Sequence, residues 1–314
     1  MIVGFQSAGT IASDADFADW VAGFRAAAPE IELRCAPDFG DLDRIEAALV
    51  WRPPPGWLAS LPRLRLIQSL GAGVDHVLAD PLLPRHVPLL RLIDPYMTRS
   101  MVEYMVFQVL RLHLREPEYR RQQARAAWRQ LVPPIAPDRR VGILGLGELG
   151  AATATSLVAL GFDVAGWSRS SKRVPGVVSF AGPAELPAFL ARSEILLCLL
   201  PLTAATEGIL GAANFRHLPP GAGLINAGRG RHLVETDLIA ALETGQLSEA
   251  VLDVFREEPL PPAHPFWSHP RIVVTPHVAA MTNPATAAEC IAVNLRRLAA
   301  GDAFADRIDP QTGY

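Results

Sequence analysis

A short apolar run, Val141–Leu144, leads directly into the glycine turn Gly145–Gly150, and the following run Ala151–Leu160 is compatible with a helix. The turn has the pattern G-x-G-x-x-G, whose glycines allow a tight turn, a close approach to a pyrophosphate, and close packing of the helix on the strand. Unpaired N–H groups at the N-terminus of such a helix bind phosphate. Because strand, turn and helix occur in the required order, a glycine turn without a ligand is the weaker interpretation. We therefore expect a dinucleotide site on a parallel sheet.

The rest of the chain alternates short apolar strands with helical stretches, which is typical of parallel sheets covered by helices. Its 314 residues are enough for two domains. Helices are expected over Asp16–Ala28 and over roughly Ser100 to Arg115, with a break near Pro117. The first series of expected strands lies near Ile2–Phe5, Ile31–Cys35, Ala47–Trp51, Leu64–Ser69 and Leu89–Leu92.

A second series of expected strands starts at Val141–Leu144 and continues near Asp163–Trp167, Ile195–Leu200, Gly223–Asn226, Ala250–Val254 and Ile272–Thr275. One further helix, about Ala285–Ala300, cannot form a domain alone, so we infer that it packs on the first domain. Residues 1–96 and 282–314 would then form a discontinuous substrate-binding domain, and residues 97–281 the dinucleotide-binding domain. The predicted fold class is α/β, with two Rossmann-like or flavodoxin-like parallel-sheet domains and a ligand cleft between them.

Composition narrows the class of protein. Half of the residues are apolar, 19% are charged, and the net charge of -3 gives no reason to expect nucleic acid or a membrane surface as a partner. No apolar run approaches the roughly 20 residues that span a bilayer, and Met1–Gly9 lacks the basic region of a signal peptide. The cysteines, at positions 35, 198 and 290, lie far apart, which suits a reducing, cytoplasmic setting without a metal site.

The segment after the second strand of this series indicates the cofactor. An NAD enzyme would place an acid about twenty residues beyond the glycine turn to bind the ribose 2′-hydroxyl. Here Trp167 is followed by Ser168-Arg169-Ser170-Ser171-Lys172-Arg173, and Lys172 is the only lysine of the chain. Three cations and three hydroxyls suit a 2′-phosphate. We therefore expect NADP (as NADPH), with NAD as the weaker alternative and a merely solvated basic turn as the other interpretation.

Three later segments carry chemistry at expected strand ends. Arg229 lies in a glycine turn, Glu257 and Glu258 follow the next strand, and His277 follows the last. Reduction of a 2-keto acid needs a cation for the carboxylate, a proton donor for the carbonyl oxygen, and a hydride. Arg229 can grip carboxylate and carbonyl oxygens in a forked contact. His277 can donate the proton, and a carboxylate partner would stabilise its charged form. We expect Glu258 as that partner, because Pro259 restricts its backbone.

The other seven histidines, including His76 and His264, have no such setting, and a structural or exposed role is the expectation for each.

The glycine turn, Asn226–Gly230, Leu252–Pro261 and Thr275–Ala280, in this order and spacing, resemble the D-isomer-specific 2-hydroxyacid dehydrogenases. The resemblance implies catalytic roles for Arg229, Glu258 and His277, and places Asp253 at the nicotinamide end of the cofactor. It also implies that backbone N–H groups of Gly71, Ala72 and Gly73 receive the substrate carboxylate, as in a nest. The cofactor site so assigned comprises Gly145, Leu146, Gly147, Glu148, Leu149, Gly150, Trp167, Ser168, Arg169, Ser170, Lys172, Arg173, Leu200, Pro201, Thr206, Ala227, Gly228, Arg229, Asp253 and His277.

Within that family the chain is similar to the bacterial glyoxylate/hydroxypyruvate reductase A group, on Ala48–Trp51, Trp167–Arg169, Pro175–Gly182 and the final Gly-Tyr pair. The likeness implies a cytoplasmic homodimer that reduces glyoxylate and hydroxypyruvate with NADPH. It further implies that Trp51 lines the substrate pocket and that Trp128 reaches the partner's site, although ordinary core or interface roles are equally expected for both. Three alternatives remain: a reductase of bulkier 2-keto acids, a phosphoglycerate or formate dehydrogenase, and a non-enzymatic dinucleotide sensor on the same fold.

Overall fold

The computed structural model describes residues 1–7, 14–304 and 307–309, and the chain divides into two compact units. The first unit comprises Met1–Met97 and Thr282–Tyr314, and the second comprises Thr98–Met281. Among the described residues, no helix is both long enough and apolar enough to cross a membrane.

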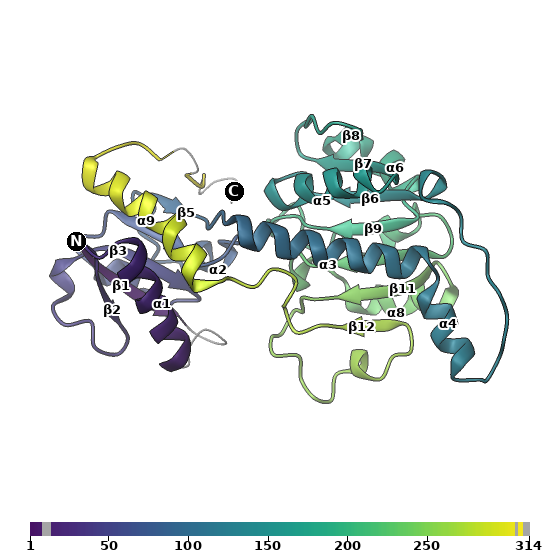
Figure 1. Ribbon diagram of the computed structural model, residues 1–314, viewed down its shortest axis with the longest axis horizontal. Coiled ribbons are helices and arrows are strands. Elements are labelled where there is room, and N and C mark those ends of the chain that lie inside the picture. Colours follow the sequence, from purple (N-terminus) through teal and green to yellow (C-terminus); the bar gives the residue numbers. More distant parts are fainter. Residues whose placement is uncertain (8–13, 305–306, 310–314) are drawn as a thin grey trace. The chain divides into compact units, whose positions relative to one another are not determined.

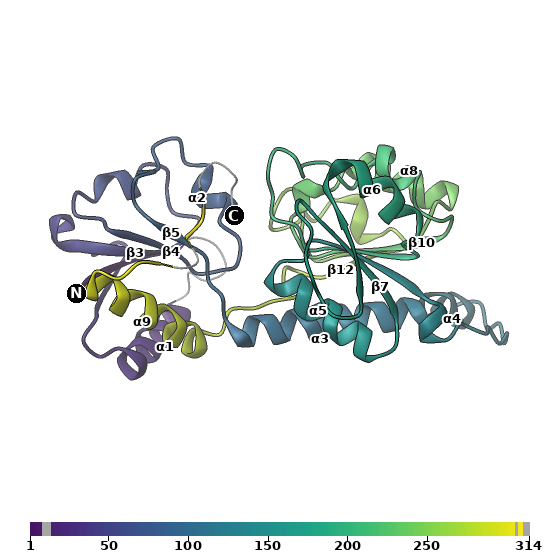
Figure 2. The same cartoon turned by 90° about the horizontal axis from the view of Figure 1, so that it is seen from above.

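The first unit is built on a five-stranded, all-parallel sheet with the order β2-β1-β3-β4-β5. Helix α1 (Asp14–Ala27) and the C-terminal helix α9 (Pro284–Ala300) lie side by side on one face of it (Figures 1 and 2). Side chains tie α9 to the sheet, since Asn294 Nδ2 donates to Gln68 Oε1 at 3.0 Å. The strands are β1 (Ile2–Ser7), β2 (Glu32–Cys35), β3 (Ile45–Trp51), β4 (Leu66–Ser69) and β5 (Leu89–Leu90).

The second unit is built on a seven-stranded parallel sheet with the order β12-β11-β10-β9-β6-β7-β8. Its first strand, β6, lies in the interior of the sheet, and the chain adds β7 and β8 on one side before it adds β9 to β12 on the other. Such a reversal creates a crevice at the carboxyl ends of the strands, where open α/β sheets bind ligands. The strands are β6 (Arg140–Leu144), β7 (Asp163–Ser168), β8 (Val177–Ala181), β9 (Ile195–Cys198), β10 (Ala222–Asn226), β11 (Leu247–Leu252) and β12 (Ile272–Val274).

Helices cover both faces of this sheet (Figure 2). Helix α3 (Pro95–His113) and α5 (Glu148–Ala159) bury Met105 and Leu157 against one face. On the other face α6 (Gly182–Ala191) and α8 (Glu235–Thr244) bury Leu190 and Leu238. The apolar strands are thus buried on both sides, as their near-continuous hydrophobic runs require. Two short helices complete the unit, α4 (Glu116–Gln123) and α7 (Ala212–Phe215).

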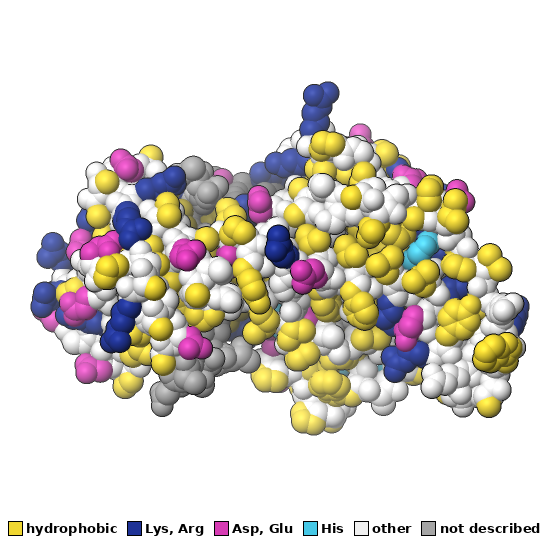
Figure 3. Space-filling model, in the orientation of Figure 1, with side chains coloured by type: hydrophobic (Ala, Val, Ile, Leu, Met, Phe, Trp, Pro, Cys, Tyr) yellow, Lys and Arg dark blue, Asp and Glu magenta, His cyan; other side chains and the backbone are white. Residues whose placement is uncertain are grey.

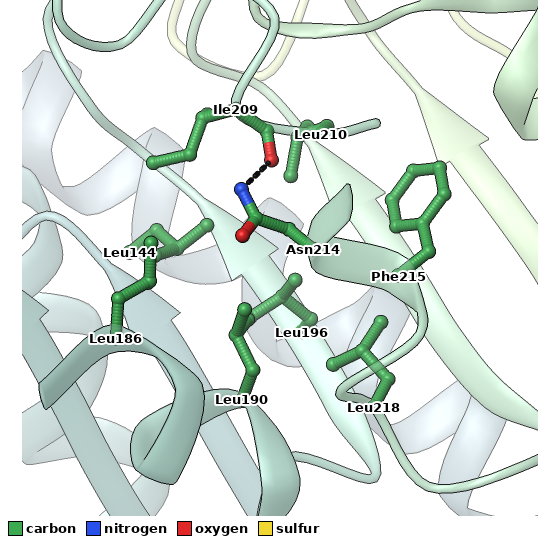
Figure 4. A pocket seen from close by; sticks show the side chains of 9 residues that line it. All are labelled: Leu144, Leu186, Leu190, Leu196, Ile209, Leu210, Asn214, Phe215 and Leu218. Carbon is green, nitrogen blue, oxygen red and sulfur yellow. Dashed lines mark hydrogen bonds between the residues drawn. The ribbon is translucent and has the colours of Figure 1, made fainter. Parts of the chain in front are cut away.

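The core beneath α6 and α7 is closed (Figure 4). Leucines from β6, β9 and α6 converge there with Phe215, and the interstice that they enclose leaves no space for a water molecule. The one polar side chain on its wall, Asn214, donates to the Ile209 carbonyl at 2.7 Å. This interstice is packing space and not a ligand site.

The expected strands are all present; the differences are shifted element ends and one additional strand. The helix expected from Ser100 begins at Pro95, because proline suits a first helical turn and Asp94 Oδ1 accepts the Tyr96 N–H at 3.0 Å. That helix ends at His113, and Pro117 lies in the first turn of α4. Strand β9 stops at Cys198, short of the expected Leu200. The edge strand β8 was not among the expected strands.

Candidate active site

The glycine turn lies between β6 and α5, with Gly147 at the N-cap of the helix. A Cβ on Gly150 would stand 1.8 Å from the Gly145 carbonyl oxygen, so only glycine allows this close turn. A Cβ on Gly147 would meet no atom of the described residues within 4 Å. Among the described residues, no side chain caps α5, so no side-chain acceptor engages its first N–H groups. The turn therefore offers an uncapped helix N-terminus, which suits a pyrophosphate.

The remaining turn residues differ in exposure. Leu146 is buried, Leu149 is half-buried, and Glu148 is exposed to solvent. The Glu148 carboxylate consequently has water available, which limits its repulsion of a phosphate bound at the turn.

The basic segment follows β7. Trp167 is buried and its indole N–H donates to the Gly182 carbonyl at 2.8 Å, while the buried Ser168 hydroxyl donates to the Ser170 carbonyl at 2.8 Å. These two side chains hold the turn, whereas Arg169, Lys172 and Arg173 are exposed beyond it. Within the described part of the chain, no carboxylate forms an ion pair with Lys172 or Arg173, so both cations are available to an anion.

The loop after β9 carries Leu200, Pro201 and Thr206. Leu200 is buried. The Thr206 hydroxyl donates to the Pro201 carbonyl at 2.7 Å and accepts the Thr203 N–H at 2.9 Å. Thr206 thus fixes the shape of this loop from within.

Two buried side chains clamp the turn that carries Arg229. Asn226, the last residue of β10, accepts the Gly228 N–H and donates to the Arg229 carbonyl. His232 Nδ1 accepts the Arg229 N–H at 3.1 Å, so its ring proton is on Nε2 and points to the Pro201 carbonyl, 3.3 Å away. Ala227 and Gly228 are buried between these contacts. His232 therefore has a positioning role beside the arginine, which its sequence setting does not reveal.

The imidazole of His277 lies against Glu258, with Nδ1 3.0 Å from Oε2. The other oxygen of Glu258 accepts the Phe255 N–H at 3.0 Å, and the peptide bond from Glu258 to Pro259 is cis. Glu257 is exposed, so Glu258 is the partner of the histidine. The pairing leaves Nε2 of His277 as the nitrogen that can reach a substrate.

Asp253 holds the loop that carries His277. Its carboxylate accepts the Val278 and Ala279 N–H groups, both at 2.9 Å, and the Thr275 hydroxyl at 2.6 Å. The side chain is buried, and burial raises the pKa of Asp253. These contacts give the carboxylate a scaffolding role, in addition to the place at the nicotinamide that the family resemblance implies.

In the first unit, the turn after β4 contains Gly71, Ala72 and Gly73. The Ser69 hydroxyl accepts the Gly71 N–H at 3.2 Å and donates to the Gly73 carbonyl at 3.1 Å. Among the described residues, the N–H groups of Ala72 and Gly73 have no acceptor. The Trp51 ring packs on Gly71 so closely that a Cβ there would lie 2.7 Å from it. The turn is thus a candidate anion site, with Ala72 and Gly73 as donors and Gly71 already engaged.

The comparisons with known proteins agree with this arrangement. The family model of the D-isomer specific 2-hydroxyacid dehydrogenase NAD binding domain matches residues 106–279. A protein named glyoxylate/hydroxypyruvate reductase A from Serratia proteamaculans is 48% identical over 301 residues, covering 94% of this chain and 96% of the relative. Its namesake from Photorhabdus laumondii is 45% identical over 304 residues, covering 95% and 97%.

Two solved structures superpose over the whole chain. A D-isomer specific 2-hydroxyacid dehydrogenase from Xanthobacter autotrophicus Py2, in complex with NADPH and MES, has a TM-score of 0.93 and 43% identity, covering 100% of this chain and 99% of the other. An NADPH-dependent glyoxylate/hydroxypyruvate reductase from Sinorhizobium meliloti, in complex with NADP and sulfate, has a TM-score of 0.91 and 37% identity, with the same coverage.

Proposed function

Because this chain belongs to the D-isomer specific 2-hydroxyacid dehydrogenase family, we propose that it reduces glyoxylate to glycolate and hydroxypyruvate to D-glycerate with NADPH. The observation that carries the proposal is the pair His277–Glu258, a proton donor with its carboxylate, in the same unit as a dinucleotide turn and its basic segment. Relatives that carry the name of this reaction cover nearly the whole chain, which supports the choice of substrates.

The residues present fit NADPH. The open space in front of Gly147 and the uncapped N-terminus of α5 suit the pyrophosphate. The exposed cations Arg169, Lys172 and Arg173 suit the 2′-phosphate, and no acid stands where an NAD enzyme binds the ribose. When bound, NADPH supplies the hydride for the carbonyl carbon. NAD is the weaker alternative for the same site.

The chain's own residues supply the remaining chemistry. His277 Nε2 donates a proton to the carbonyl oxygen as that oxygen gains charge, while Glu258 holds the imidazole through Nδ1. Arg229, fixed by Asn226 and His232, polarises the carbonyl and binds the carboxylate through its planar fork. One hydride and one proton convert the 2-keto acid to the 2-hydroxy acid.

The turn of the first unit takes the substrate carboxylate in this proposal. The unengaged N–H groups of Ala72 and Gly73 support it, because backbone donors in a turn bind small anions without a cation. Trp51, packed on Gly71, sets the width available beside them. A broad ring next to the anion site favours small 2-keto acids.

The test is a set of initial rates of nicotinamide oxidation with glyoxylate, hydroxypyruvate, pyruvate and phenylpyruvate, each with NADPH and with NADH. We expect the highest kcat/KM for the two small acids with NADPH. A preference for phenylpyruvate would retain the chemistry and overturn the substrate. Tight NADPH binding without turnover of any acid would replace the reductase by a dinucleotide sensor.

We also propose that the protein is a homodimer through α3, α4 and the segment after them. Hydrophobic side chains gather over this part of the surface (Figure 3). Monomers rarely expose so many large apolar groups together. Those on this surface are Phe107, Leu114, Tyr119, Trp128, Val132 and Ile135, with Trp128 96% exposed.

In the proposed dimer Trp128 reaches the site of the partner subunit. Sedimentation velocity should give twice the mass of the chain, and Phe107→Asp with Leu114→Asp should shift it to the monomer. An unmodified protein that sediments as a monomer would contradict the proposal. We also propose that the reaction takes place in the cytoplasm, since the three cysteines lie far apart in the sequence, which suits a reducing setting.

A further inference from the structure

A line of hydroxyl groups leads from helix α3 to the loop that carries the histidine. The Tyr104 hydroxyl lies 2.7 Å from the Thr275 hydroxyl, which lies 2.6 Å from Asp253 Oδ1. Tyr104 is on α3, Thr275 follows β12, and Asp253 follows β11, so three separate elements meet here. Neither hydroxyl is among the groups assigned to the substrate or the cofactor.

The direction of these hydrogen bonds depends on their last member. An ionised carboxylate only accepts, so the Thr275 hydroxyl donates to Asp253 and its oxygen is left to accept from Tyr104. Burial raises the pKa of Tyr104 to about 12, so the phenol keeps its proton throughout the working range of an enzyme. Both hydrogen bonds are therefore donated in the same direction, from Tyr104 to Thr275 and from Thr275 to Asp253.

Asp253 in turn determines where His277 lies. The Asp253 carbonyl accepts the His277 N–H at 2.9 Å, and its carboxylate accepts the next two N–H groups, of Val278 and Ala279. His277 has a φ of 56°, in the left-handed region that residues other than glycine seldom adopt. Such a conformation persists where surrounding contacts over-determine it. The carboxylate of Asp253 provides those contacts.

We propose that Tyr104 is a positioning residue of the reductase, acting through Thr275 and Asp253 to hold His277 in its left-handed conformation against Glu258. The proposal rests on the proposed function, in which His277 donates the proton. It assigns to α3 a part in the reaction beyond covering the sheet. It also gives a reason for a tyrosine, and not an apolar residue, at this half-buried position beside Thr275.

Loss of the Tyr104 hydroxyl would change the activity through the pKa of the Asp253 carboxyl. His277 faces Asp253 from its own loop, and Arg111 and Gln108 face Tyr104 from α3. Burial already raises the pKa of Asp253, and the donated hydrogen bonds oppose that rise. Without the Tyr104 hydroxyl, Thr275 donates less strongly, so the Asp253 pKa rises further. Protonated Asp253 releases its acceptor contacts, and activity is then lost at a higher pH on the acidic side.

The test compares Tyr104→Phe with Tyr96→Phe, an exposed tyrosine on the same helix. We expect Tyr104→Phe to lower kcat roughly three- to tenfold, as the loss of one hydrogen bond predicts, with the KM for NADPH unchanged. The acidic limb of its pH profile should move to higher pH. Tyr96→Phe should leave both unchanged. Equal kcat and superimposable profiles for Tyr104→Phe and the unmodified enzyme would overturn the proposal.

A second variant distinguishes the proposed positioning role of Tyr104 from a general loss of stability. Thr275→Val removes the middle hydroxyl. Because Tyr104→Phe and Thr275→Val interrupt the same series of hydrogen bonds, the double variant should be no slower than Thr275→Val alone. A decrease in kcat of the double variant equal to the product of the two single decreases would contradict a connected series of hydrogen bonds. If the unmodified protein reduces no 2-keto acid, the proposed function fails, whereas normal turnover with an unaffected Tyr104→Phe overturns only the role of Tyr104.

Discussion

Nδ1 of His277 lies 3.0 Å from Oε2 of Glu258, and this contact leaves Nε2 as the edge of the imidazole that is not engaged by Glu258. Glu258 accepts a hydrogen bond from the Phe255 N–H, so the imidazole of His277 is held at Nδ1 and its Nε2 is left unengaged by Glu258. In the proposed reaction, a proton donor held in this way needs no rearrangement when the carbonyl oxygen gains charge.

The first prediction concerns this donor. His277→Ala should lower kcat roughly 10²- to 10⁴-fold, the usual contribution of a general acid, while NADPH affinity stays nearly unchanged. Stopped-flow reduction rates and fluorescence titration of NADPH measure the two quantities. His86→Ala, at an exposed histidine of the first unit, is the control. Near-normal turnover in His277→Ala would refute the assignment of the acid.

The second prediction concerns the cations after β7. Replacing Arg169, Lys172 and Arg173 by Ala should weaken NADPH binding at least roughly tenfold, since a hydrogen bond to a charged group contributes about 1.5–3 kcal/mol. NADH has no 2′-phosphate, so its affinity should change little and serves as the internal control. Calorimetric titration with both cofactors measures the difference. Equal losses would mean that this turn does not bind the 2′-phosphate.

The third prediction separates fold from function within the glycine turn. Gly147→Ala places its Cβ in space free of protein atoms, so it should keep the melting temperature of the free enzyme but weaken NADPH binding. Gly150→Ala drives its Cβ into the Gly145 carbonyl and should lower the melting temperature itself. Scanning calorimetry of both variants, with and without NADPH, distinguishes them. An undiminished NADPH affinity in Gly147→Ala would exclude the cofactor from this space.

The fourth prediction concerns stability and pH. Burial, with a smaller contribution from Arg139, lowers the pKa of His113 from its ordinary value of 6.5. As pH falls below that value, the unfolded chain takes up a proton that the native state does not bind, so the free energy of unfolding decreases. His113→Leu removes this difference in proton binding between the native and unfolded states. Its melting temperature should therefore drop less than that of the unmodified protein between about pH 7 and about pH 5.5.

A matched variant keeps this test specific. His86→Leu, at an exposed position, should track the unmodified protein across the same range. Parallel curves for all three proteins would show that His113 does not govern acid sensitivity.

Much of the fold could be predicted because its signals are local. The run Val141–Leu144 and the glycines after it specify strand, turn and helix within about twenty residues, and the structure has them in that order. The family and the two parallel sheets are likewise confirmed. Strand β8 was missed because Val177–Ala181 is half-exposed at the sheet edge and lacks a continuous apolar run.

The contacts within the site could be predicted less well, because they join distant segments. Tyr104 and Thr275 are 171 residues apart, and nothing in either segment marks the other as its partner. His232 resembled any other histidine, since its bonds to Arg229 and Pro201 depend on two loops from different strands. The left-handed backbone of His277 is equally invisible in the sequence, because its hydrogen bonds and those of the next two residues go to Asp253, in another segment.

Helix α3 has two sides: Tyr104 contacts Thr275, while Phe107 is exposed to solvent. A helix is stiff along its axis, so a partner subunit that shifts one side of it also shifts the other. In the proposed dimer, association and ligand binding are then thermodynamically linked. If the second subunit changes the affinity for NADPH or substrate by some factor, that ligand must change the affinity of the two subunits for each other by the same factor.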